Sequence, residues 1–357
     1  MKARSVTLAD VASAAGVSYQ TVSRVLNHPA SVAARTRTKV EAVMAELNYV
    51  PNRVAQQLAG KRSRTLGLAT SDLALLAPAQ IASAIQHQAS VRDYRLVIAM
   101  AGPAGAEGAV HELMAQRVDA LLINLPLDSE QASAIAAMAD NLPCLFLDVP
   151  EEAPVACCQF SVETGARQGA EHLLSLGHRD IALLNGPAHS VAARARYQVW
   201  LSVLQEHQLQ PHSVLTGDWS ARSGYQAIIS LAGRPLPGAL LVANDQMALG
   251  ALRALNQTGL RIPGDISVVG YDDTAESAWY QPPLTTVRQD MQQLGKCSVD
   301  WLVNRLEGEA PSEPLSPFAP RLVVRDTTAP PDSERVGIKY LAGELRRLAH
   351  LLEGQQK

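Results

Sequence analysis

The stretch from Thr7 to Asn27, TLADVASAAGVSYQTVSRVLN, limits most strongly what this chain can fold into. It predicts two short helices separated by Gly16, which supplies the positive φ that a tight turn between helices needs. Thr7 and Ser18 are residue types that cap helix N-termini, and each precedes apolar residues at helical spacing. Two short helices joined by a glycine-containing turn form a helix-turn-helix unit.

The second of these helices has an outward face that suits DNA. This face carries Tyr19, Gln20, Ser23 and Arg24. In a helix-turn-helix unit the second helix lies in the major groove, with its N-terminal residues against base edges. Glutamine and arginine make bidentate contacts with adenine and guanine. A helical hairpin in some other core is the alternative, and it leaves Gln20 and Arg24 unexplained.

The charge distribution agrees with a DNA-binding head. Through Arg62, nine Lys and Arg stand against three Asp and Glu, so this segment carries +6 and the rest of the 357 residues −9. A basic head on an acidic body is typical of a DNA-binding domain attached to another module.

Two further segments complete the head. A third helix is expected over 33–47, where apolar residues at helical spacing would cover the first two helices. Residues 53–58 have room for about two helical turns, well below the roughly 12–15 residues of a marginal isolated helix. We expect them to fold only against a second copy and DNA, with Leu58 as a minor-groove wedge. A plain interdomain linker is the alternative.

From Arg64 the pattern changes to alternating strands and helices. Strands are expected at 65–71, 95–100, 120–126, 144–149, 157–160, 180–186, 213–218, 239–245, 265–273 and 284–290. Helices are expected at 79–92, 107–117, 164–176, 191–207, 221–232 and 246–258. Near-continuous apolar strands joined by helices predict parallel sheets covered on both faces. About 260 such residues predict two α/β lobes.

Polar side chains follow several of these strands. Because ligands of parallel α/β folds bind at the carboxyl ends of strands, these side chains are candidates for a binding site. They are Ser71, Asn124, Asp148, Asn244, Asp245, Asp272, Asp273 and Gln289, joined by Arg194, Arg196, Phe160 and Trp219. Carboxylates, amides and arginine beside aromatic faces predict a neutral polyhydroxyl ligand, a sugar above all. Taken singly, each residue also fits a helix cap or a loop hydrogen bond.

Catalytic and metal-binding signatures are missing from the sequence. There is no GxSxG elbow and no Walker loop. His111-Glu112 has no second histidine four residues on, and AGPAGAEG (101–108) lacks the GxGxxG order. We therefore expect no enzyme and no metal site, and a sugar transferase or isomerase is the unsupported alternative.

The spacing of the cysteines and the length of the apolar segments indicate the cellular compartment in which the protein is expected. The four cysteines show no CxxC spacing, and we expect them to be reduced core residues. No apolar segment reaches the length of a membrane span, and the N-terminus has no signal-peptide core, so a cytoplasmic location is expected.

The C-terminal segment follows TTAPPDSE (327–334), a linker by composition. Apolar residues then repeat at spacings of 3, 4, 3 and 4, at Ile338, Leu341, Leu345, Leu348 and Leu352. This is an a/d heptad seam, and one helix of about 20 residues cannot bury it alone. Association with other copies is expected; a helix folded back on its own body is the alternative.

Long stretches of the chain resemble the LacI/GalR family of bacterial transcription regulators. They include VSYQTVSRV, PNRVAQQLAGK, LVANDQMALGA and DISVVGYDDT. The resemblance implies an all-α helix-turn-helix headpiece, a two-lobed periplasmic-binding-protein-like α/β core with parallel sheets, and a C-terminal heptad helix. The resemblance implies a headpiece over 1–51, a hinge helix and linker over 52–63, a regulatory core over 64–329, and a linker with a tetramerisation helix over 330–357. Within the core, one lobe would comprise 64–160 with 291–321, and the other 161–290 with 322–329.

The resemblance also implies a function. The chain would repress lactose-utilisation genes at a pseudo-palindromic operator and release it when an allolactose-type β-galactoside binds between the lobes. It would need no cofactor and would assemble from homodimers to a homotetramer. A family regulator with a different effector, including a corepressor, is the alternative. A sugar-binding transport protein is another class to consider. Such a protein would carry a signal peptide and would lack the basic head, and this sequence differs in both respects.

Site residues follow from the resemblance by position. Those implied for DNA are Thr7, Ser18, Tyr19, Gln20, Thr21, Ser23, Arg24, Asn27, Asn52, Ala55, Gln56 and Leu58. Those implied for the ligand are Ser71, Leu75, Ile81, Asp148, Phe160, Arg196, Trp219, Asn244, Asp272, Gln289 and Leu294. Three positions depart from the family sequence: Met291 replaces an aromatic pocket residue, Ala192 a serine and Leu76 a histidine.

Overall fold

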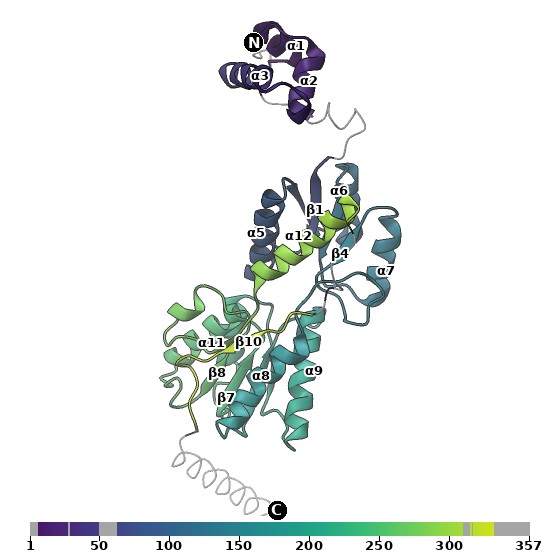
Figure 1. The fold of residues 1–357 in the computed structure, drawn as a ribbon. Helices are drawn as coiled ribbons and strands as arrows, with labels where there is room; N and C mark the ends of the chain where they lie inside the picture. The colour runs from purple at the N-terminus through teal and green to yellow at the C-terminus, as the bar shows by residue number, and fades with distance from the viewer. Residues whose placement is uncertain (1–5, 28, 50–62, 310–314, 316, 332–357) are drawn as a thin grey trace, which may run out of the picture. The chain divides into compact units, whose positions relative to one another are not determined.

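A computed structural model describes residues 6–27, 29–49, 63–309, 315 and 317–331 (Figure 1). Contacts divide the chain into two compact units, Met1–Ser63 and Arg64–Lys357. The predicted hinge helix, with Asn52, Ala55, Gln56 and Leu58, lies outside the described residues. So does the heptad seam from Ile338 to Leu352, and so does the side chain of Asn27.

The first unit is a small helical bundle. It contains α1 (Leu8–Ala15), α2 (Tyr19–Asn27), a 3₁₀ turn (Pro29–Ser31) and α3 (Ala34–Glu46). Thr7 and Asp10 form a reciprocal capping box at the start of α1, and Gly16 ends this helix with φ 62°. Val11, Val22 and Val40 are fully buried where the three helices meet. The three predicted helices are thus confirmed.

The first lobe of the core is a parallel sheet with the strand order β2-β1-β3-β4. Its elements are β1 (Thr65–Thr70), α5 (Leu76–Val91), β2 (Arg95–Met100), α6 (Gly105–Ala115), β3 (Ala120–Asn124), α7 (Ser129–Met138), β4 (Cys144–Phe146) and α12 (Met291–Glu307). Alternate residues of β3 point to opposite faces: Leu122 packs with α5 and α12, and Leu121 packs with α6. Both faces are therefore buried.

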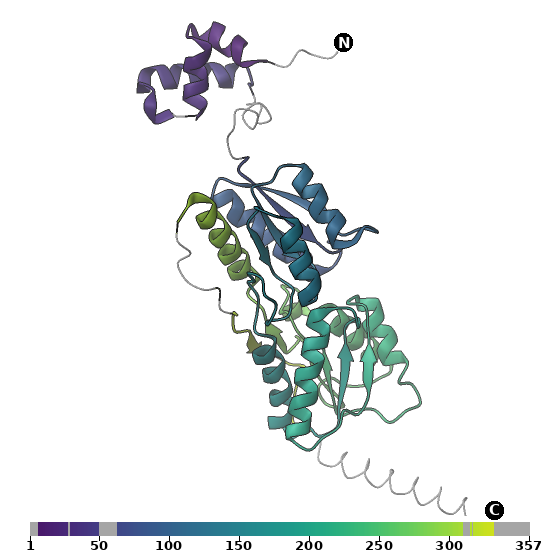
Figure 2. The same ribbon diagram turned by 90° about the vertical axis from the view of Figure 1, so that its right-hand side faces the viewer.

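Helix α12 joins this lobe from far along the sequence. It packs against α5, and Figure 2 shows it beside the blue elements of the first lobe. Leu294, Val299 and Leu302 are buried in that contact. The chain then returns to the second lobe, where β10 (Arg321–Val323) pairs antiparallel with β9 (Thr286–Arg288).

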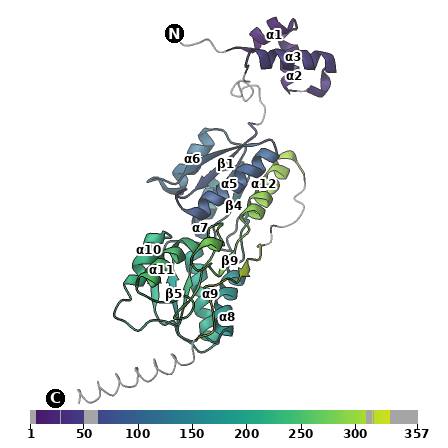
Figure 3. The ribbon, with the colours of Figure 1, turned by 90° about the vertical axis from the view of Figure 1, so that its left-hand side faces the viewer.

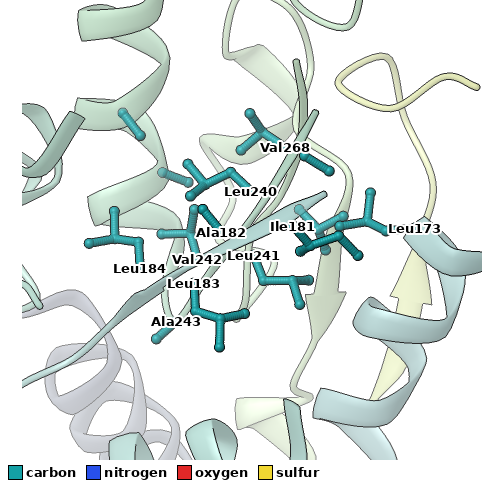
Figure 4. Packing of buried hydrophobic residues seen from close by; sticks show 14 of the residues in the cluster. Leu173, Ile181, Ala182, Leu183, Leu184, Leu240, Leu241, Val242, Ala243 and Val268 are labelled. Atoms are coloured by element: carbon teal, nitrogen blue, oxygen red, sulfur yellow. The ribbon is translucent and has the colours of Figure 1, made fainter. Parts of the chain in front are cut away.

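The second lobe repeats the arrangement, with the strand order β6-β5-β7-β8. Its elements are α8 (Val162–Ser175), β5 (Ile181–Asn185), α9 (Val191–Glu206), β6 (Val214–Thr216), α10 (Ala221–Ile229), β7 (Ala239–Val242), α11 (Asp245–Gln257), β8 (Ser267–Val269) and a 3₁₀ turn (Ser277–Trp279). Helices α8 and α9 pack together, and so do α10 and α11 (Figure 3). Leu183, Leu241 and Val268 lie in the core between these layers (Figure 4).

The expected fold class is confirmed, with local differences. The strand predicted at 157–160 is wrong, since Cys157 and Phe160 make only isolated bridges, to Phe146 and Phe318. This segment crosses from one lobe to the other and therefore has no continuous partner strand. The predictions also missed α7, α12 and β10.

Candidate functional site

The start of α2 presents an exposed polar face. The N–H of Thr21 donates to Oγ of Ser18 at 3.1 Å, which caps the helix as predicted. Val22 and Val25 are buried, whereas Gln20 and Arg24 are exposed and Tyr19 is 56% exposed. The side chains with base-reading chemistry thus lie on the outer face of a firmly capped helix.

The neighbouring candidates of the headpiece serve the helix ends as well. Oγ1 of Thr7 lies 2.7 Å from Oδ2 of Asp10 in the capping box, and Oγ of Ser18 lies 2.9 Å from Oγ1 of Thr21. Thr21 and Ser23 are half-buried. Thr7, Ser18 and Thr21 thus form hydrogen bonds within the headpiece itself.

The core encloses a cavity of about 700 Å³ lined by residues of both lobes. All eleven predicted ligand residues line it. From the first lobe and its crossovers come Ser71, Leu75, Ile81, Asp148, Phe160, Gln289 and Leu294; from the second lobe come Arg196, Trp219, Asn244 and Asp272. Among them, the strand-end residues Ser71 and Gln289 lie more than 200 positions apart, whereas Leu75, Ile81 and Leu294 were implied by the resemblance alone.

Arg196 is a buried guanidinium held from several sides. It stacks 3.8 Å from the ring centroid of Tyr271 and 5.8 Å from that of Trp219. Its Nη1 donates to the carbonyl oxygen of Ala243, and its Nη2 lies 3.8 Å from Oδ1 of Asp272. Its Nε has no hydrogen-bond partner among the described residues. Arg196 is therefore fixed in place, and its Nε–H can still donate a hydrogen bond to a ligand.

Asp272 is the matching acceptor. It has a positive φ of 117° and is only 7% exposed. Its Oδ1 likewise lacks a hydrogen bond from any residue that the structure describes. Burial raises the pKa of this carboxyl to about 8, although the charge of Arg196 lowers it. A buried polar atom without a partner is costly, so this pair favours a ligand that supplies hydroxyl groups.

Trp219 forms an aromatic wall that Asn244 positions. Asn244 caps α11 by accepting from the N–H of Met247 at 2.9 Å. Its Nδ2 donates to the carbonyl oxygen of Trp219 at 3.0 Å. The indole ring lies against Gly186, where a Cβ would come within 2.4 Å of the ring. Only glycine at this position admits the ring as placed.

The opposite side of the cavity is mainly apolar. Leu75, Ile81, Met291 and Leu294 line it, and Phe160 packs 6.0 Å from Phe318, ring centroid to ring centroid. Asp148 is a charged group on this side, and burial raises its pKa to about 6 against the lowering charge of Arg196. The cavity therefore combines a polar end with an apolar wall, as ligand pockets commonly do.

Two of the strand-end carboxylates do not line this cavity. Asp245 is fully buried and accepts from the N–H of Thr274 at 3.0 Å and from Oγ of Ser277 at 2.6 Å. Asp273 forms ion pairs with Arg288 and Arg325. Both hold the loop that carries Asp272, so their function is structural support.

The sequence reasoning missed several lining residues. Ser190, Gln159 and Gln246 line the cavity. Ser190 lies four residues after a predicted strand and Gln159 within one, whereas Gln246 directly follows the strand predicted at 239–245 and was still overlooked. Oε1 of Gln246 accepts from the N–H of Leu76 at 3.1 Å, across 170 positions of sequence. No local sequence signal marks a contact of that kind.

A headpiece that presents base-reading side chains and a core with a cavity suited to a small polar ligand are typical of a ligand-responsive DNA-binding regulator. The comparisons support this class. The profile "Bacterial regulatory proteins, lacI family" matches residues 7–52, and a periplasmic binding protein-like domain matches 170–328. The chain belongs to the lacI family of bacterial regulatory proteins.

Its relatives cover nearly the whole chain. It is 52% identical over 349 residues to the lactose operon repressor of Escherichia coli strain K12, covering 96% of each chain. It is 42% identical over 335 residues to that of Klebsiella pneumoniae, covering 92% of this chain and 94% of the relative. A solved lac repressor dimer with operator and the anti-inducer ONPF matches with a TM-score of 0.85 and 52% identity, covering 91% of this chain and 100% of that one.

These relatives confirm the resemblance drawn from the sequence, and both curated ones are repressors rather than enzymes. Within the described ranges, no three His, Cys, Asp or Glu side chains gather in a way that could hold a metal ion. The helices of the described part of the chain include none long and apolar enough to cross a membrane.

Proposed function

We propose that this chain represses lactose-utilisation genes by binding operator DNA, and that an allolactose-type β-galactoside releases it. The buried pair Arg196 and Asp272 is the main observation that supports galactoside binding. Each has an atom without a hydrogen-bond partner among the described residues, and Arg196 lies beside the ring of Trp219. Similarity to the lactose operon repressors supports the same function.

A galactoside suits the chemistry of the cavity. Its hydroxyl groups can donate to Asp272 and accept from Arg196, which satisfies both buried groups. Its apolar C–H face can pack on Trp219. Nη2 of Arg196 and Oδ1 of Asp272 lie only 3.8 Å apart, so neighbouring hydroxyl groups of one sugar can reach both. The apolar wall of Leu75, Ile81 and Leu294 is free to contact the second sugar or another aglycone.

The headpiece would read the operator through α2. Tyr19, Gln20 and Arg24 face outward from this helix and would contact base edges in the major groove. Two copies in a homodimer would present two such helices to a pseudo-palindromic site. We assign 1–51 to the headpiece and 52–63 to the hinge, with Leu58 as the minor-groove wedge.

The core, 64–329, would couple the two sites allosterically, and the segment 330–357 would join two dimers into a homotetramer. A tetramer meets a second operator on the same DNA at high effective concentration. Because its proposed target is chromosomal DNA, we propose that the protein acts in the cytoplasm.

Fluorescence anisotropy with a labelled lac-type palindrome at fixed salt tests this function, since affinity for DNA depends on salt. We expect tight operator binding that a β-galactoside weakens. Arg196→Ala should bind the operator as the parent does and no longer respond. A galactoside that strengthens binding would indicate a corepressor instead. Equal binding to palindrome and random DNA would contradict the proposed target.

A further inference from the structure

Helix α5 begins without a cap from its own preceding residue. Leu75, the N-cap residue, is extended (φ −80°, ψ 138°) and its side chain makes no capping hydrogen bond. The first N–H groups of a helix have no partner within the helix. The N–H of Leu76 instead donates to Oε1 of Gln246 at 3.1 Å. The cap of this helix therefore comes from another part of the chain.

This hydrogen bond joins the two lobes beside the ligand cavity. Leu76 starts a helix of the first lobe, whereas Gln246 is the second residue of α11 in the second lobe. Gln246 lines the cavity, and so do Leu75 and Ala77, which flank Leu76 in sequence. Any change in the angle between the lobes that separates these two atoms leaves the start of α5 without this cap.

The residues before Gln246 hold the polar end of the cavity. Asn244 donates to the carbonyl oxygen of Trp219. Asp245 accepts from Thr274 and Ser277 and so fixes the loop that carries Asp272. Three consecutive residues at the start of α11 thus contact the aromatic wall, the acidic loop and the other lobe.

We propose that Gln246 is a coupling residue, which links the state of the cavity to the first lobe by capping α5 across the lobes. This inference rests on the proposed function, because it requires two lobe arrangements that differ in affinity for operator and galactoside. A hydrogen bond present in only one arrangement stabilises that arrangement. Its removal therefore shifts the galactoside concentration that half-releases the operator.

Variants can remove either side of this hydrogen bond. Gln246→Ala deletes the acceptor. Leu76→Pro deletes the donor, and it fits because proline is favoured at the first helical position and Leu75 already has the extended conformation that precedes a proline. Leu76→Ala shortens the same side chain and keeps the N–H. Gln257→Ala removes a glutamine of the same helix whose bond, to Oη of Tyr225 at 2.9 Å, stays within the second lobe.

Operator release by isopropyl β-thiogalactoside should be titrated by anisotropy for the full chain and each variant. We expect Gln246→Ala and Leu76→Pro to shift the midpoint in the same direction by about two- to tenfold, the net worth of one neutral hydrogen bond. The double variant should shift it no further than either alone, since both remove one interaction. Leu76→Ala and Gln257→Ala should stay within about twofold of the parent.

Two results would overturn the coupling role. One is an unchanged midpoint in Gln246→Ala and Leu76→Pro, even if both unfold at a lower temperature, because the bond would then only stabilise the fold. The other is a double variant whose shift is the product of the single shifts. A parent protein that binds the operator but ignores the galactoside would defeat the proposed function itself, and this inference with it.

Discussion

Asp272 shows how one residue is prepared for a ligand at a cost in stability. The pKa of its carboxyl is raised from 3.8 to about 8 by burial. The folded chain therefore holds this proton more tightly than the unfolded chain. The stability contributed by the protonated group is complete below pH 3.8 and is lost progressively as the pH rises to about 8.

Asp272→Asn should reveal this cost. Because asparagine does not ionise, the variant should be more stable than the parent, by a margin that grows between pH 5 and pH 8. Thermal unfolding at both pH values measures the margin, and a margin that shrinks as the pH rises would contradict the account. Galactoside affinity should fall by about 0.5–1.5 kcal/mol, as for loss of a hydrogen bond between neutral groups.

Gln20 is the residue on which base recognition is most easily tested. It is exposed on the outer face of α2, where a side-chain amide can make a bidentate contact with adenine. Gln20→Ala should relax base preference at one operator position and cost about 1–3 kcal/mol. Binding to a set of operators with single base changes measures this, and an unchanged pattern of preference would remove Gln20 from the reading face.

The residues of the cavity were predictable in part, and the reason is physical. Parallel strands end at one edge of a sheet, so polar residues after strands, such as Asn244 and Asp272, could be placed together from sequence. Their individual bonds could not be predicted. Asp245 and Asp273 looked equivalent to Asp272, yet their partners, Ser277 and Arg325, turn them into supports for the loop.

At the scale of elements, local signals predicted the headpiece well. The capping box of α1, the glycine turn and the cap of α2 all depend on residues within four positions of one another. Helix α7 carried a similar signal in its Asp128–Gln131 capping box, which the prediction overlooked. Helix α12 also carried local signals, the Asp290 cap and Gly308 at its end, which the prediction overlooked. Its packing on α5, some 200 residues earlier, leaves no such local signal.

Gly16→Ala tests the turn between α1 and α2. Gly16 has φ 62°, and a Cβ there would meet only Nζ of Lys39, at 3.7 Å, so strain in the backbone is the main penalty. We expect the headpiece to lose about 1–2 kcal/mol. Hydrogen exchange at the amides of α1 and α2 in the full chain measures this loss. Unchanged protection would mean that the turn tolerates a side chain.

At the scale of the whole molecule, the heptad segment predicts the assembly. Ile338, Leu341, Leu345, Leu348 and Leu352 repeat at the spacing of a coiled-coil seam. Deletion of 335–357 should convert the proposed tetramer into a dimer that still binds a single operator. Sedimentation equilibrium distinguishes the two, and an unchanged tetramer would show that other surfaces join the dimers.

In the proposed mechanism, one chain carries a DNA-binding site and a galactoside-binding site, and binding at either site lowers the affinity of the other. Linkage requires the two effects to be equal, since they measure one coupling free energy. The most direct test is to measure galactoside affinity by calorimetry with and without saturating operator, and operator affinity with and without saturating galactoside. We predict that each ligand weakens the other by the same factor. Galactoside affinity that the operator leaves unchanged would contradict the account.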